Sequence, residues 1–593
     1  MDDIAPHWDL ESVCPGGPGG ETFIERHRRS ADELAALQTR VEQLGPLAGD
    51  PDGWATLVLD LEQARIRLHE LSTFAGCSAS ADTRSGDARR AEAMVDELDQ
   101  AIDGVRVWLS AAVTEAPDEI FTPWVARDAL ADARPALLHT RAGARFQLPR
   151  EQQSIVVSME RESLTGWGRL YDLVAGGLTW PLTVRGETRT VGVAELLSRL
   201  SDADPDVRRA AHHAQHAAWD SVKDLCAHTL TQITGSRQTR QDRLGVDPVS
   251  VSLHRNRLQR ATLDAMWTVA DTLRPTLVRY LERKAKLLGK SQLDWWDLDA
   301  PLQAGESDAL TWDGTTHSIE QAFATFHPDL SQFARRAFDG QWIDAAPGPD
   351  RRAGGFCANL PVMRQSRIFM TFTGSHDNGM TLAHELGHAW HNHVISEQSG
   401  FRQRLTSALA ETASTFAEAI YRDQVLEAAT DRQTRVLMLD QELQAAVAFL
   451  MNIPFRFKFE ERLYELRRKG SFNPDELSAE MVRFQRETYA DALASYSPLF
   501  WCWKLHYYIP SFGFYNWPYT FGYLFSAAVY ARAKAEGPSF MPALQDLLRR
   551  TGWQDTEPLV AETMNADTTE PAFWASAAAP IAEKVQTFLE LTD

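Results

Sequence analysis

Apolar residues recur three and four positions apart along most of this chain, which is the spacing of one face of an α-helix. A clear example runs through Trp54, Leu57 and Leu61. Clusters of Gly, Pro, Ser and Asp interrupt the pattern, for instance at residues 50–53 and 85–87, where long helices would end and turn back. We therefore expect a mostly α-helical fold.

Two short segments depart from the helical pattern. Residues 178–191 are rich in β-branched side chains around a glycine, which predicts a hairpin. Residues 367–373 predict a single strand that ends at Gly374. The pair Asp204-Pro205 then supplies an N-cap and a first residue for a new helix.

The length of 593 residues exceeds what one hydrophobic core usually supports, so we expect two lobes. The hairpin marks the end of the first lobe. The predicted boundary gives an N-terminal helical lobe over residues 1–195 and a second domain over residues 196–593.

The charge balance limits the partners. The chain has 60 Lys and Arg against 81 Asp and Glu, a net charge of −21. Nucleic acids and anionic membrane surfaces both require a basic footprint, so we expect neither as a partner. Five cysteines without a CxxC motif favour a reducing compartment. The N-terminus lacks the signal-peptide pattern and no uncharged apolar run of about 18 residues occurs, so we expect a cytoplasmic protein.

One short motif carries recognisable chemistry. His384, Glu385 and His388 form an HExxH pattern, and on a helix the two histidines project from one face. Each could bind a zinc ion through nitrogen at roughly 2.0–2.1 Å, while Glu385 could accept a proton from water. Gly387 lowers helix stability by about 1 kcal/mol relative to Ala, so its presence predicts close packing there. A surface or core helix whose histidines only form hydrogen bonds is the alternative.

A third ligand is available downstream, since catalytic zinc takes three protein ligands. Glu411 follows His388 by 23 residues and lies on a helical run. Glu418 lies two turns later on the same face, where its carboxylate could orient a metal-bound histidine. These acids would also fit a solvated helix face. A second pair, His212 and His216, has no acid within its motif and is better explained as a helix surface.

The segments 384–391 (HELGHAWH) and 410–418 (AETASTFAE) resemble peptidase family M3, in its oligoendopeptidase F branch. The likeness extends to Trp8-Asp9-Leu10, to residues 295–298 and to residues 514–525, so it covers essentially the whole chain. The resemblance implies a mostly helical, two-lobed clamshell with a deep central channel. It also implies one Zn²⁺ per chain and short peptides as substrates.

The resemblance also assigns roles by motif. His384, His388 and Glu411 would be the zinc ligands, and Glu385 would be the general base. Residues 196–593 would then be the zinc metallopeptidase catalytic domain, with a small sheet or edge strand beside the HExxH helix. The strand at 367–373 would offer its edge to an extended peptide, and Phe369 and Thr371 would contact that substrate.

Residues 496–530 hold 15 Phe, Trp or Tyr in 35 positions, and an aromatic core explains most of them. By the same resemblance, His506 and Tyr523 would be catalytic donors to the oxyanion of the tetrahedral intermediate. Tyr515 and Tyr519 would contact the substrate.

Two alternatives to a zinc endopeptidase remain at this point. The first is a metal-dependent carboxypeptidase of the HExxH class, which would require a free substrate C-terminus. The second is a non-catalytic peptide-binding protein with the same clamshell. The cleavage-site preference and the oligomeric state do not follow from the sequence.

Overall fold

The computed structural model describes residues 5–160, 162–302 and 310–593. The chain divides into two compact units that each combine three separate stretches. Unit 1 consists of Met1–Ala144, Asp308–Val425 and Arg532–Ala566, and unit 2 of Arg145–Ser307, Leu426–Ala531 and Asp567–Asp593. This spatial division differs from the predicted boundary at 195/196, because both units draw on early, middle and late parts of the chain. The division of the chain at 195/196 into domains stays a prediction.

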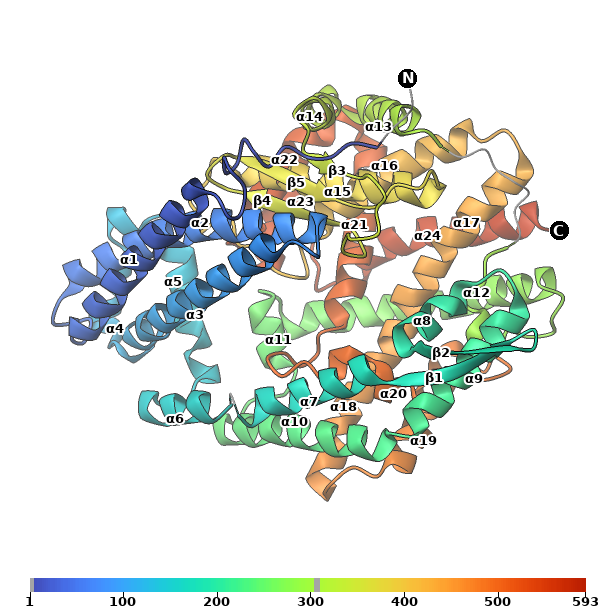
Figure 1. The fold of residues 1–593 in the computed structure, drawn as a ribbon, viewed down its shortest axis with the longest axis horizontal. Helices are drawn as coiled ribbons and strands as arrows, with labels where there is room; N and C mark the ends of the chain where they lie inside the picture. The colour runs from blue at the N-terminus through green and yellow to red at the C-terminus, as the bar shows by residue number, and fades with distance from the viewer. Residues whose placement is uncertain (1–4, 161, 303–309) are drawn as a thin grey trace. The chain divides into compact units, whose positions relative to one another are not determined.

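Helices dominate both units, which confirms the predicted fold class (Figure 1). The helices of unit 1 are α1 (Glu21–Gln43), α2 (Pro51–Ala81), α3 (Gly86–Glu115), α4 (Asp118–Val125), α5 (Arg134–Ala142), α13 (Trp312–Phe326), α14 (Pro328–Asp339), α15 (His376–Ile395), α16 (Thr412–Ala428), α22 (Met541–Arg550) and α23 (Thr556–Met564). Those of unit 2 are α6 (Arg150–Glu160), α7 (Leu164–Gly177), α8 (Val193–Ser198), α9 (Pro205–Asp220), α10 (Lys223–Leu244), α11 (Ser250–Arg255), α12 (Arg260–Leu287), α17 (Arg432–Val447), α18 (Ile453–Lys469), α19 (Pro474–Tyr489), α20 (Phe500–Trp503) and α24 (Pro571–Leu591), while α21 (Trp517–Glu536) begins there.

The first three helices pack against one another in unit 1 (Figure 1). Their boundaries follow from local chemistry. The Asp50 side chain accepts a hydrogen bond from the Gly53 amide at 2.8 Å at the start of α2. The Ser85 side chain does the same for the Ala88 amide at 3.2 Å at the start of α3. The helix breaks predicted at 50–53 and 85–87 are therefore confirmed.

Unit 2 contains the predicted hairpin, formed by β1 (Thr179–Val184) and β2 (Glu187–Gly192) in antiparallel register. Helix α9 begins as expected, with Asp204 at the N-cap and Pro205 at the first position. These elements were predictable because turn and cap residues act within a few positions of the chain.

A three-stranded sheet lies beside α15 in unit 1, as the resemblance predicts (Figure 1). Its order is β3 (Ile343–Asp344), β5 (Gln365–Phe369) and β4 (Phe356–Leu360). Strand β5 pairs with β3 on one side and with β4 on the other. The prediction that this strand offers a free edge is therefore wrong within the described residues, where β3 and β4 are the two outer strands of the sheet.

The side chain of Phe369 belongs to a small apolar cluster beside this strand. It is completely buried, and its ring packs against Trp8 at 5.6 Å and Phe356 at 5.3 Å between centroids. The side chain is therefore part of the core, and a contact of Phe369 with substrate stays a prediction. Thr371 is half-buried beyond the end of β5, and its contact with substrate stays a prediction.

A continuous helical run over Arg432–Lys469 in unit 2 is long and apolar enough, by length and composition, to cross a membrane. An 18-residue window within it has a mean hydropathy of 1.3, and 56% of that window is buried inside the protein. The core helix of a soluble protein has the same properties, so this helix is only weak support for a membrane span.

Candidate metal centre

Helix α15 carries the HExxH motif and starts at a well-defined cap. The Ser375 side chain accepts a hydrogen bond from the Asn378 amide at 3.2 Å, and Asn378 Oδ1 accepts one from the Ser375 amide at 3.3 Å. Asn378 Oδ1 also accepts from the Thr373 amide at 2.7 Å, which ties the helix to the segment that connects it with β5. This capping box fixes where the helix begins and therefore which side chains share its inner face.

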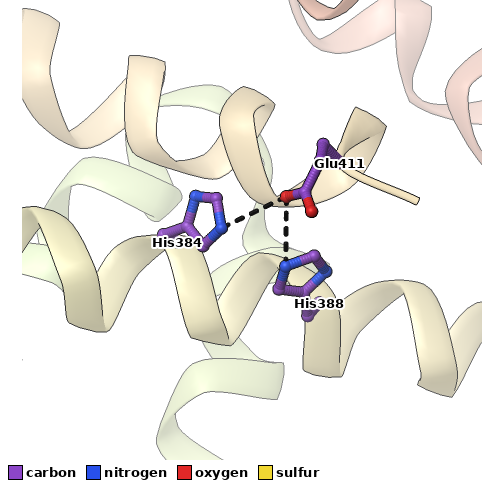
Figure 2. A group of neighbouring side chains, drawn as sticks. All are labelled: His384, His388 and Glu411. Carbon is purple, nitrogen blue, oxygen red and sulfur yellow. Dashed lines mark ion pairs between the residues drawn. The ribbon is translucent and has the colours of Figure 1, made fainter. Parts of the chain in front are cut away.

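The side chains of His384, His388 and Glu411 converge on one point (Figure 2). The Nε2 atoms of His384 and His388 lie 3.3 Å and 3.2 Å from the same oxygen, Oε2 of Glu411. Ligand atoms around a tetrahedral zinc at roughly 2.0–2.1 Å are about 3.3–3.4 Å apart. The spacing and the donor set of two imidazoles and a carboxylate therefore fit a metal site.

A second carboxylate, that of Glu418, contacts the other ring nitrogen of His384. Glu418 Oε2 lies 3.2 Å from Nδ1 of His384. Glu418 follows Glu411 by seven residues, which is about two helical turns, so both side chains lie on the same side of the segment. A proton on Nδ1 then points to Glu418, and Nε2 keeps its lone pair for a metal. Arg422 forms an ion pair with Glu418. Burial raises the pKa of Glu418, but Arg422 and His384 outweigh it, so this carboxyl remains ionised.

The charges of the cluster show how strongly it attracts a cation. Burial alone would lower the pKa of His384, yet the hydrogen bonds to Glu411 and Glu418 raise it to about 10. Burial would raise the pKa of Glu411, but its hydrogen bonds to His384 and His388 hold that pKa well below its usual range. Without a metal, the proton on His384 and the charge of Arg422 together balance the two carboxylates, and a divalent cation could replace that proton.

Gly387 lies where α15 meets the start of α16, which carries the chain onward from Glu411. A Cβ atom at this position would lie 2.5 Å from the Ala413 carbonyl oxygen and 2.5 Å from Ser414 Cα. Real side chains do not tolerate such distances to backbone atoms. The close packing predicted from this glycine is confirmed, and it lets Glu411 come within reach of both histidines.

Glu385 lies in the same cavity without ligating the point where the other three converge. It is 6% exposed, and its Oε2 has no hydrogen-bond partner among the described residues. Burial raises the pKa of Glu385, and the neighbouring His388 and His384 only partly oppose it. A buried, unpartnered carboxylate that borders a cavity is suited to accept a proton.

The cavity has a volume of about 390 Å³ and lies entirely within unit 1. Its walls include three side chains that sequence reasoning did not select, namely Cys357, Asn392 and Leu405. Asn392 Nδ2 donates to Ser366 Oγ at 3.2 Å and contacts Cys357 Sγ at 3.8 Å. Burial and the Glu385 carboxylate raise the pKa of the Cys357 thiol, which disfavours a thiolate. The one sequence feature that could have indicated this wall is the glycine pair Gly354-Gly355, which directly precedes β4.

Four further residues predicted at the active site belong to unit 2, namely His506, Tyr515, Tyr519 and Tyr523. His506 lies in a short 3₁₀ turn, and its ring centroid is 5.3 Å from Tyr515 and 6.0 Å from Tyr519. Tyr523 stacks on Phe449 at 4.8 Å. The structure thus gathers His506, Tyr515 and Tyr519, while their action on a substrate held in unit 1 stays a prediction.

His506 has the properties of a neutral hydrogen-bonding group. Burial, followed by the charges of Lys504 and Arg456, lowers the pKa of His506 to about 3. Its Nδ1 is shielded from solvent and has no partner among the described residues. A neutral imidazole with one unused nitrogen can present an N–H group to a ligand without carrying a charge.

Comparison with known proteins shows where this site belongs. The sequence profile of peptidase family M3 matches residues 198–578. Oligoendopeptidase F (chromosomal) of Lactococcus lactis subsp. cremoris is 24% identical over 342 residues, which are 57% of this chain and 56% of the lactococcal protein. The group B oligopeptidase PepB of Streptococcus agalactiae is 24% identical over 261 residues, 44% and 43% of the two chains. The matched stretch thus spans only about half the length of these curated relatives.

Solved structures show the same fold over nearly the full length. A candidate peptidase from Chlamydophila abortus has a TM-score of 0.85 at 15% identity and covers 99% of this chain and 100% of its own. Oligoendopeptidase F from Enterococcus faecium has a TM-score of 0.72 at 16% identity, covering 96% and 98%. At these identities the likeness establishes the fold alone. The profile match covers more than half of the sequence, and the chain belongs to peptidase family M3.

Proposed function

We propose that this protein is a zinc-dependent endopeptidase that hydrolyses short peptides. The observation that carries the proposal is the convergence of His384 Nε2, His388 Nε2 and Glu411 Oε2 beside the unpartnered carboxylate oxygen of Glu385. Membership of a peptidase family and the oligoendopeptidase names of the curated relatives support it.

The protein's own groups divide the work of amide hydrolysis. A zinc ion held by His384, His388 and Glu411 would supply Lewis acidity and lower the pKa of water. Glu385 accepts the proton of the attacking water and later passes it to the leaving amine. Its burial favours this role, because a raised pKa brings the carboxyl closer to the working pH.

His506 and Tyr523 are the proposed donors to the oxyanion of the tetrahedral intermediate. Neutral His506 can donate from one ring nitrogen, and a tyrosine hydroxyl donates in the same way. A donor of this kind is typically worth about 10²–10³ in rate. Tyr515 and Tyr519, whose rings lie 5.9 Å apart, are the proposed aromatic contacts for the substrate.

The edge of β4 is the proposed binding place for the peptide backbone, in place of the β5 edge that the sequence suggested. Gly355, Phe356 and Cys357 border the cavity, and β4 has only one partner strand among the described residues. The Thr73 hydroxyl of α2 donates to the Asn359 carbonyl at 2.9 Å, so the far end of the edge is already covered. A short extended peptide can add to the remainder by backbone hydrogen bonds.

A mixed peptide library tests the function as a whole. We expect the zinc-loaded protein to cleave internal bonds of short peptides, a chelator to abolish cleavage, and added zinc to restore it. Mass spectrometry of the products identifies the bonds that are cut. Equal cleavage of C-terminally amidated and free peptides supports an endopeptidase, whereas cleavage restricted to free C-termini would establish the carboxypeptidase alternative. Peptide binding without any product would leave the non-catalytic alternative.

The Glu418→Gln variant tests the support behind His384. An amide cannot balance the imidazole charge as a carboxylate does, so we expect zinc affinity to fall about 10- to 100-fold. Competition with a chromophoric chelator measures this affinity. Glu427→Gln, an exposed position on the same helix, is the matched control and should bind zinc as the wild type does. Equal zinc affinity of all three proteins would contradict the role given to Glu418.

A further inference from the structure

Residues 509–516 of unit 2 lie between the turn that carries His506 and the start of α21, which carries Tyr519. All eight residues of this segment are described, and none of them belongs to a helix or a strand. Tyr515 lies within the segment, and its ring centroid is 5.3 Å from that of His506 and 5.9 Å from that of Tyr519. The placement of the Tyr515 ring therefore depends on contacts that fix the backbone of segment 509–516.

Two arginines of unit 2 bind carbonyl groups of the segment. Arg237 of α10 donates through Nη2 to the carbonyl oxygens of Ile509 and Phe512. Arg255 of α11 donates to the Ser511 carbonyl at 2.9 Å, and its guanidinium lies over the Phe512 ring at 4.7 Å from the centroid. Hydrogen bonds from charged donors are stronger than those between neutral groups. The first half of the segment is thus attached to α10 and α11.

Helix α18 holds the second half of the segment at Phe514. The Phe514 amide donates to Glu460 Oε1 at 2.6 Å. The Phe514 ring is buried, and its centroid lies 5.6 Å from that of Tyr464 and 5.4 Å from that of Phe457, both on α18. Phe514 has a backbone φ of 56°, which is uncommon for a bulky residue and persists only where the surroundings fix it. Glu460 therefore helps to hold the backbone at its least favourable point.

A carboxylate at position 460 is costly for the fold. Glu460 is 2% exposed, and its Oε2 has no hydrogen-bond partner among the described residues. Burial raises the pKa of Glu460 to about 7, although Arg237 and the Phe514 amide oppose this shift. A leucine would fill a similar volume without the cost of burying a charge. What the carboxylate adds is an acceptor for the Phe514 amide.

Gly513 shows that these groups meet at one point of the segment. A Cβ atom on Gly513 would lie 3.1 Å from the Tyr464 hydroxyl, 3.7 Å from Glu460 Oε1 and 3.8 Å from Arg237 Nη1. Side chains from α10 and α18 therefore surround the backbone between the two halves of the segment. Loss of either charged group would release a backbone contact close to Tyr515.

We propose that Glu460 and Arg237 are positioning residues, which hold segment 509–516 in the conformation that presents Tyr515 to the peptide substrate. The inference rests on the proposed function, in which Tyr515 contacts the substrate, and it adds two residues that act through that contact. An interaction made with the bound substrate as well as in the transition state affects KM more than kcat. Loss of Glu460 or Arg237 should therefore weaken peptide binding and leave the chemical step largely intact.

Substitutions at Glu460 test the hydrogen bond to Phe514 with the full-length, zinc-loaded protein and a quenched peptide. We expect Glu460→Leu to raise KM about tenfold and to change kcat by less than about threefold. Glu460→Gln should retain most of the wild-type KM, because its amide oxygen can accept the same hydrogen bond. Glu465→Leu is the matched control, since Glu465 is an exposed residue of the same helix, and its KM should equal that of the wild type.

Substitution of Arg237 tests the same role from the other helix, and it decides the question if Glu460→Leu does not fold. Arg237→Gln should also raise KM more than it lowers kcat. Arg243→Gln, at an exposed position of α10, is its control and should behave as the wild type does. An unchanged KM in Arg237→Gln and in folded Glu460→Leu, an equal loss in Glu460→Gln and Glu460→Leu, or a fall in kcat alone would each overturn the proposal.

Peptide binding separates this inference from the proposed function. Fluorescence anisotropy of a labelled peptide with zinc-loaded Glu385→Gln protein measures Kd without turnover. Adding Glu460→Leu or Arg237→Gln to this protein should raise Kd by the same factor as KM. An unchanged Kd would contradict the positioning role, whereas absence of cleavage by the wild type, with Kd still sensitive to Glu460→Leu, would contradict only the proposed peptidase activity.

Discussion

The Glu385→Gln protein is expected to hold one zinc ion per chain and to cleave peptides about 10³-fold more slowly than the wild type, or slower still. The amide keeps the size of the carboxylate but cannot accept a proton from water. Zinc should remain because the converging atoms belong to His384, His388 and Glu411, and Glu385 is not among them. Initial rates and elemental analysis of the purified proteins provide the two measurements.

Glu397→Gln is the control for this experiment, since Glu397 is exposed just beyond the end of α15. Its activity should match the wild type. Substantial residual activity in Glu385→Gln, at full zinc content, would show that another group acts as the general base. Loss of zinc from Glu385→Gln would show instead that the ligand set is wrongly assigned.

The Gly387→Ala protein is expected to lose both stability and activity through a single methyl group. Its Cβ would meet backbone atoms of Ala413 and Ser414 at 2.5 Å, and neither can rotate away. Overpacking of this kind costs about 1–3 kcal/mol. The start of α16 must shift, which displaces Glu411, and a misplacement of about 1 Å can lower the rate about 10²-fold. Thermal unfolding and kcat/KM together measure the effect.

Gly76→Ala is the matched control, because Gly76 lies within α2 of the same unit and no atom lies within 4 Å of an added Cβ. Alanine is favoured over glycine inside a helix by roughly 0.5–1 kcal/mol, so this protein should unfold at the same or a higher temperature. If Gly387→Ala behaved like Gly76→Ala, the close approach of α15 and α16 would not be needed to build the site.

The local features of the fold and the site were predictable from the sequence. The four-residue spacing of His384 and His388 determines that both imidazoles leave one helix face. The seven-residue spacing of Glu411 and Glu418 likewise places both carboxylates on one side of their segment. Their approach to the histidines depends on the packing of α16 against α15 at Gly387. Capping at Ser85 and the start of α9 also depend only on neighbouring residues.

Features that depend on distant parts of the chain were not predictable in the same way. The strand predicted over 367–373 is found at 365–369, and its central place in the sheet depends on pairing with β3 and β4, which no residue within the strand encodes. For that reason Phe369 was expected at an edge and is buried.

The most direct test of the account is a zinc-edge anomalous diffraction map of the Glu385→Gln protein. We expect one peak in each chain, at roughly 2.0–2.2 Å from His384 Nε2, His388 Nε2 and a Glu411 carboxylate oxygen. A zinc-loaded, folded protein whose only peak lies among other side chains, or that shows no peak at these three, would contradict the assignment of the metal centre and the function built on it.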